Sequence, residues 1–80
     1  MEIYTLIGMR RVNFKGQDGH QVDGWNLFFQ YSDPKITGFG TEKIFISAAK
    51  FNEVTFMPEI GSDCQLTYNK YGKVADIVKA

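Results

Sequence analysis

The sequence predicts a single all-β domain of five short strands, and three observations support this fold class. Glycine falls at eight positions along the chain, namely residues 8, 16, 19, 24, 38, 40, 61 and 72. The runs between these glycines are short and rich in β-branched and aromatic residues, a pattern typical of antiparallel strands joined by tight turns. The length of 80 residues leaves room for one hydrophobic core, so residues 1–80 are expected to form one domain.

The first two strands are expected to form a long hairpin. Residues 2–14 make the first strand, in which Gly8 favours a bulge or a sharp bend where the strand changes partners. The Asp18-Gly19 pair is typical of a tight hairpin turn, and residues 21–32 return as the second strand. Apolar residues occupy alternate positions of that strand from Trp25 onward, so one of its faces is expected to pack in the core.

The second half of the chain is predicted to add a third strand, a short helical turn and a terminal hairpin. The third strand covers residues 42–47 and follows a loop whose tip is Phe39, between two glycines. Residues 47–53 have enough helical propensity for one or two turns. The last strands are expected at residues 64–69 and 74–79. This order matches a five-stranded OB-type Greek-key barrel with at most one short helical turn, which is the predicted architecture.

Several classes of catalytic and metal site lack the residues that they need. The chain has one histidine and one cysteine, His20 and Cys64, which lie far apart in the sequence. Such a pair suits neither a metal site nor a nucleophile with its base. No glycine-rich segment has phosphate-loop spacing, and acidic residues are scattered singly. We therefore expect a protein that is not an enzyme and that uses no cofactor and no metal.

Cysteine usage and hydropathy indicate where the protein works. A single cysteine cannot form an intrachain disulfide, which fits a reducing compartment. The first residues show no signal-peptide pattern, and no run approaches the roughly 18 apolar residues of a membrane helix. The expected location is the cytoplasm, without a membrane partner.

The distribution of charge indicates more than its total. The formal net charge is +0, so attraction to a polyanion has to come from local clusters of cations. The sharpest cluster is Arg10, Arg11 and Lys15, and a looser one is Lys70, Lys73 and Lys79. Neighbouring residues of a strand point to opposite faces, so Arg10 and Arg11 can line one groove only if the strand twists or bulges. A solvated hairpin explains the first cluster equally well.

Three phenylalanines are out of phase with the apolar stripe and are candidates for a surface role. Phe28 lies between polar residues, Phe45 between two isoleucines, and Phe39 between two glycines. Phe45 shares a strand face with Lys43, and Phe28 is its cross-strand neighbour if the second and third strands pair. Single-stranded nucleic acid is bound by rings on which bases stack and by cations along its backbone. A two-sided core or a dimer interface would explain the same rings.

Five segments of the chain together resemble a known family. They are Asn13-Phe14-Lys15-Gly16 with the following Asp-Gly turn, Trp25, Tyr31-Ser32-Asp33, Glu42-Lys43-Ile44 and Tyr71-Gly72-Lys73-Val74. In length, strand order and loop placement the chain resembles the helix-destabilising single-stranded DNA-binding proteins of filamentous phages. It is also similar to small proteins encoded on plasmids and on conjugative or phage elements of Gram-positive bacteria.

The resemblance implies a homodimeric OB-type barrel that binds single-stranded DNA, in preference to RNA, with little sequence preference. It implies that the first hairpin is a mobile DNA-binding wing with basic contacts at Lys15 and His20. Aromatic and basic DNA contacts would lie at Trp25, Tyr31, Phe39 and Lys43, and Tyr71-Gly72 would reach across the dimer axis. The chain departs from the family at Asp18 and Asp23, which place negative charge in the wing.

Residue chemistry and resemblance together define one set of candidate nucleic-acid contacts. The set is Arg10, Arg11, Lys15, His20, Trp25, Phe28, Tyr31, Phe39, Lys43, Phe45, Tyr71 and Lys73. The expected role is DNA binding in replication or transfer. The alternative is a protein-interaction or assembly module of a phage or mobile element that uses the same surface.

Overall fold

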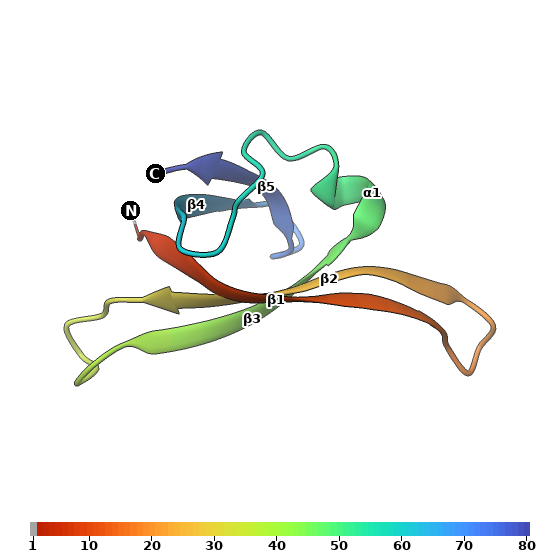
Figure 1. The fold of residues 1–80 in the computed structure, drawn as a ribbon, viewed down its shortest axis with the longest axis horizontal. Helices are drawn as coiled ribbons and strands as arrows, with labels where there is room; N and C mark the ends of the chain where they lie inside the picture. The colour runs from red at the N-terminus through yellow and green to blue at the C-terminus, as the bar shows by residue number, and fades with distance from the viewer. Residues whose placement is uncertain (1) are drawn as a thin grey trace.

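The computed structural model describes residues 2–80, which form one five-stranded antiparallel sheet and one short helix (Figure 1). The elements in chain order are β1 (Tyr4–Lys15), β2 (Gln21–Tyr31), β3 (Gly40–Ser47), α1 (Ala48–Phe51), β4 (Asp63–Tyr68) and β5 (Val74–Lys79). The mostly-β fold, the order of the elements and the single short helix are therefore confirmed.

The sheet is open, so the closed barrel expected from the sequence is not confirmed. The strand order is β3-β2-β1-β4-β5, which leaves β3 and β5 as the two edge strands. β1 pairs with β2 from Thr5 to Lys15, but it pairs with β4 only at Tyr4 and Thr5. The sheet thus consists of a long three-stranded ribbon, β1–β3, and a β4–β5 hairpin attached near one end of β1 (Figure 1).

A β-bulge lies in β1 just after its short pairing with β4, and β1 stays paired with β2 on both sides of the bulge, so the predicted bulge is present but the predicted change of partners is not. The register between β1 and β2 shifts between Leu6 and Gly8, beside the glycine at which the sequence predicts a bulge. The residue between them, Ile7, is about half exposed, whereas Leu6 is completely buried. The bulge therefore turns Ile7 toward solvent between Leu6, which is completely buried, and Met9, which still packs against the core.

The core lies between the ribbon and the elements that cover one of its faces. Helix α1 and the β4–β5 hairpin lie over that face (Figure 1). Leu27 and Phe29 of β2 are completely buried, and Trp25 and Tyr31 pack against the core with partial exposure. The apolar stripe predicted for the second strand is confirmed, because alternate residues of a strand share one face.

The segment that follows β3 is fixed by side-chain hydrogen bonds. The Ser47 hydroxyl caps α1 by accepting the backbone N–H of Lys50 at 3.2 Å. Thr55, in the loop after α1, is bound to β5: the Asp76 carboxylate accepts hydrogen bonds from the Thr55 backbone N–H at 2.7 Å and from the Thr55 hydroxyl. Across residues 2–80, no helix has the length and apolar character needed to cross a membrane.

Cys64 lies in the core beside β1. Its side chain is completely buried, and its thiol donates to the backbone oxygen of Tyr4 at 3.5 Å. Burial raises the pKa of the Cys64 thiol to about 11. This residue therefore packs as a small hydrophobe, since the reactive thiolate is strongly disfavoured there.

Candidate nucleic-acid interface

The face of the ribbon that points away from α1 and the β4–β5 hairpin carries two of the rings that are out of phase with the core. Side chains directly opposite one another on paired strands share a face, so the register defines its rows. One row is Gly8, Phe28 and Lys43, the next is Arg10, Asn26 and Phe45, and the third is Val12, Gly24 and Ser47. Phe14 and Val22 continue this face toward the hairpin turn. We call these eleven positions the outer face.

The outer face carries cations without a carboxylate. Its charged residues are Arg10 and Lys43, and all eleven of its positions belong to the described chain. Phe45 and Lys43 therefore share a face, as predicted. The residue directly opposite Phe45 is Asn26 and not Phe28, which lies opposite Lys43 on the same face. Phe14 and Phe45 are 54% and 48% exposed, so both rings remain accessible although they lie on a sheet.

The Phe45 ring leans from β3 onto β2 and lies against Gly24. A Cβ atom on Gly24 would lie 2.6 Å from Phe45 Cζ and 2.3 Å from the backbone oxygen of Ile46. Only glycine fits between these atoms, and because Gly24 has no side chain the Phe45 ring packs directly on its backbone. The backbone therefore holds the Phe45 ring in place while about half of the side chain stays exposed, which suits a platform for base stacking.

A groove of about 710 Å³ separates the edge of β3 from the turn that joins β4 to β5. Its lining residues include three lysines, two aromatic residues and one glutamate, namely Lys43, Lys50, Lys73, Phe45, Tyr68 and Glu42. These residues come from β3, α1, the end of β4 and the β4–β5 turn. Lys43 and Phe45 also belong to the outer face, so the groove and the outer face meet at these two residues of the edge strand β3.

The β4–β5 turn is held by Asn69. Its side-chain oxygen accepts the backbone N–H of Tyr71 at 2.9 Å and that of Lys73 at 3.1 Å. Gly72 completes the turn with a φ of 77°, a conformation that favours glycine. The turn places Lys73 in the groove lining, and it exposes 74% of Tyr71, whose ring lies 5.2 Å from the Lys70 ammonium.

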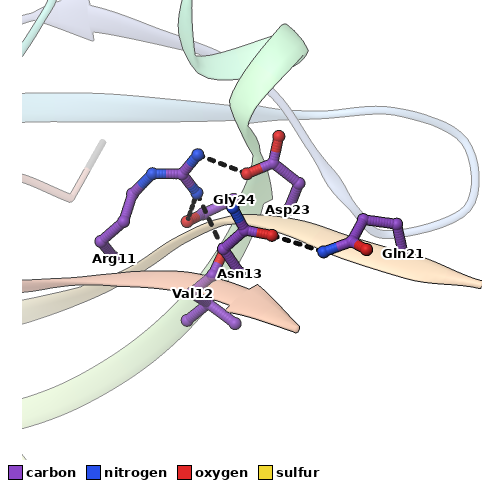
Figure 2. A network of polar contacts seen from close by, with 6 residues as sticks. All are labelled: Arg11, Val12, Asn13, Gln21, Asp23 and Gly24. Atoms are coloured by element: carbon purple, nitrogen blue, oxygen red, sulfur yellow. Dashed lines mark hydrogen bonds and ion pairs between the residues drawn. The ribbon is translucent and has the colours of Figure 1, made fainter. Parts of the chain in front are cut away.

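Arg11 is engaged within the protein, on the face opposite Arg10. Figure 2 shows its guanidinium donating to the carbonyl oxygens of Gly24 and Val12 at 2.7 and 2.8 Å and pairing with Asp23. The same guanidinium lies 5.6 Å from the centre of the Trp25 ring. These contacts link β1 to β2, and they pair Arg11 with Asp23, one of the two carboxylates of the hairpin.

The remaining hairpin candidates lie outside the groove lining. Lys15 ends β1, and His20 follows the turn with its side chain 85% exposed and its Nε2 4.0 Å from the Asp18 carboxylate. The turn itself is closed by a hydrogen bond from the Gly16 N–H to the His20 carbonyl oxygen. The hairpin tip is thus exposed but does not join the lysines of the groove.

Trp25, Tyr31 and Phe39 are not brought together with the groove residues. The Trp25 ring packs on Phe51 with centroids 5.7 Å apart, and Tyr31 meets Tyr4 edge-on at 5.5 Å. Both lie on the covered face of the ribbon, whereas Phe39 is 63% exposed in the loop between β2 and β3. Of the twelve candidates, Lys43, Phe45 and Lys73 line the groove.

The third lysine and the tyrosine of the groove lining were not among the sequence candidates. Lys50 is the single cation of α1, and Tyr68 is the last residue of β4. No local pattern in the sequence links either residue to β3. No group of three or more histidine, cysteine or acidic residues is placed to hold a metal within the described residues.

Comparison of the chain with protein-family models, with curated proteins and with solved structures finds no match.

Proposed function

We propose that this protein binds single-stranded nucleic acid in the groove between β3 and the β4–β5 turn, without catalysing a reaction. The observation that carries the proposal is the gathering of three lysines and two aromatic residues around one groove, from elements that are separate in the sequence. The lysines would neutralise backbone phosphates, and each stacked base would contribute about 1–3 kcal/mol. Preference for DNA and weak sequence preference follow from the resemblance to the filamentous-phage proteins.

We further propose that the open sheet is an OB-type barrel with its last seam, between β3 and β5, left open. A five-stranded, partly open barrel that binds oligonucleotides on its second and third strands and in two neighbouring loops defines that fold. Here those regions would be the outer face of β2 and β3, the turn at residues 16–20 and the turn at residues 69–73. A homodimer in the cytoplasm is part of the same proposal.

The salt dependence of affinity tests the role of the groove. Fluorescence anisotropy of a labelled oligo(dT) gives the binding constant at several salt concentrations. Each phosphate contact to a single strand contributes about −0.7 to the slope of log K against log salt, so three lysines predict a slope of about −2. Lys73→Ala should reduce the slope by about 0.7. Lys79→Ala, an exposed lysine outside the groove lining, is the matched control.

The absence of binding at low salt, with the protein folded by circular dichroism, would overturn the proposal. If Lys73→Ala and Lys79→Ala change the slope of log K against log salt equally, the phosphate contacts do not lie in the groove. An oligo(rU) of the same length separates DNA preference from general binding to single strands.

The two unpaired sheet edges favour a second candidate function, a protein-interaction or assembly module. Edge strands offer backbone donors and acceptors to an added strand, and β3 and β5 are the edges of the sheet formed by residues 2–80. Light scattering with and without oligonucleotide distinguishes the candidates. Growth of the complex only with a protein partner, and never with oligo(dT), would support the interaction module.

A further inference from the structure

A second hollow lies on the outer face and shares no lining residue with the groove. Its volume is about 380 Å³, and it runs along β1 beside β2. Outward-facing residues of its lining are Arg10, Val12, Phe14 and Asn26. The hollow therefore combines a cation, an exposed ring, an aliphatic wall and an amide on an uncovered sheet surface.

These side chains match the parts of a nucleotide. The Phe14 ring, 54% exposed, offers a face on which a base stacks. The Asn26 amide has both donors and an acceptor, so it is able to bond to the edge of a stacked base. Arg10 is exposed on the same row as Asn26, where its guanidinium can meet a phosphate.

We propose that this hollow is a second base-binding subsite for the nucleic-acid strand held in the groove. In this subsite a base stacks on Phe14, the Asn26 amide bonds to its edge, and Arg10 contacts the phosphate. The inference rests on the proposed function, since it extends the same bound strand beyond the groove.

The register gives the strand a direct path between the two sites. Phe45 in the groove lining, Asn26 and Arg10 lie opposite one another on three adjacent strands. Adjacent strands are about 4.8 Å apart, so the path from Phe45 to Arg10 is about 10 Å. At about 3.4 Å per stacked nucleotide, it corresponds to about three nucleotides.

Charge on the outer face favours a polyanion over a second copy of the chain. Arg10 and Lys43 stand on this face, and its described positions hold no Asp or Glu. The same face of a second copy would bring like charges together, whereas a phosphate backbone would neutralise both. The charges of the outer face therefore favour nucleic acid as its ligand over a second copy of the chain.

The dependence of affinity on oligonucleotide length tests the subsite. Because the path between the two sites is about three nucleotides long, an oligo(dT) of about 3 nucleotides is too short to occupy both, whereas one of about 12 nucleotides reaches the hollow as well as the groove. Phe14→Ala should weaken binding of the longer strand about 5–150-fold and leave the shorter strand unaffected. Lys73→Ala should weaken both lengths, and Phe39→Ala, an exposed ring outside both sites, should weaken neither.

Each outcome separates the subsite from the groove. Equal affinity of the wild type for both lengths, with Phe14→Ala silent, overturns the subsite and leaves the groove intact. No binding of either length overturns the groove, and the subsite with it. If light scattering shows a dimer without nucleic acid that Phe14→Ala converts to a monomer, the outer face is an interface between copies and the subsite is wrong. Arg10→Gln, on the same row as Asn26, gives a second variant should Phe14→Ala fail to fold.

Discussion

Replacement of Phe45 by alanine separates binding from stability, because its ring lies on the surface and belongs to both the groove and the outer face. The side chain is 48% exposed, so about half of it is buried. Complete burial of a phenylalanine contributes about 1.5–3 kcal/mol, and half of that predicts a loss of about 1 kcal/mol in the free energy of unfolding. Loss of one stacked base costs about 1–3 kcal/mol, so affinity for oligo(dT) should fall about 5–150-fold.

Urea unfolding and anisotropy measure the two effects of Phe45→Ala separately. Phe29→Ala is the core control, since this ring is completely buried and its truncation costs about 3–5 kcal/mol, comparable to the stability of a small domain. Trp25 fluorescence is suited to follow unfolding, because its ring packs on Phe51 on the covered face. Unchanged affinity in a folded Phe45→Ala protein, or destabilisation equal to that of Phe29→Ala, would refute the surface role of this ring.

Two further predictions concern stability. Gly24→Ala should lower the free energy of unfolding in urea by about 1–3 kcal/mol, because its Cβ would lie 2.3 Å from a backbone oxygen. Gly8→Ala, whose Cβ would meet nothing closer than 3.6 Å, is the control and should be neutral or stabilising, and equal losses would contradict the steric argument. Hydrogen bonds from the Thr55 side chain and backbone lower the pKa of the Asp76 carboxyl. In the unfolded chain the pKa of this carboxyl is about 3.9. The ionised Asp76 carboxylate therefore stabilises the folded state above that pH, and the stabilisation is lost as the pH falls through the lower pKa of the folded state. The drop in thermal midpoint between about pH 6 and about pH 3 should therefore be smaller in Asp76→Asn than in the wild type, and identical drops would contradict the linkage.

The strands could be predicted from the sequence because their signals are local. The Asp18-Gly19 turn and the alternation that begins at Trp25 each depend on a few neighbouring residues, and both appear in the structure as expected. Closure of the sheet depends instead on whether β3 and β5 meet. These strands are separated by α1, a long loop and β4, so no short pattern reports their distance. The open seam is a tertiary property that alternation cannot reveal.

The candidate site was predictable where strand pairing alone determines it. Phe45 and Lys43 share a face because they are two residues apart on one strand, and pairing of β2 with β3 adds Phe28. Lys50 and Tyr68 reach the groove only through the packing of α1 and the β4–β5 hairpin beside β3. A cluster of cations in the sequence does not show which of them form ion pairs within the folded protein. For this reason the sequence did not distinguish Arg11, which pairs with Asp23, from Arg10.

A net charge of +0 is compatible with binding a polyanion, because a local excess of lysines attracts phosphate whatever the total charge. The groove lining contains Lys43, Lys50 and Lys73 but one carboxylate, Glu42. The molecule extends over 43 × 26 × 25 Å, whereas charges are screened beyond about 8 Å at physiological salt, so acidic residues on distant faces contribute little.

Removal of the groove's carboxylate tests this effect of local charge. Glu42→Gln should tighten oligo(dT) binding about two- to five-fold, the effect of one exposed charge at close range. Glu59→Gln makes the same change in net charge outside the groove lining and should leave affinity unchanged. If both substitutions tighten binding equally, the total charge of the protein governs affinity, and the local arrangement of lysines does not. The dependence of the gain on salt adds a second check: a gain from close contact should persist at higher salt concentrations than a gain from total charge, since screening removes long-range interactions first.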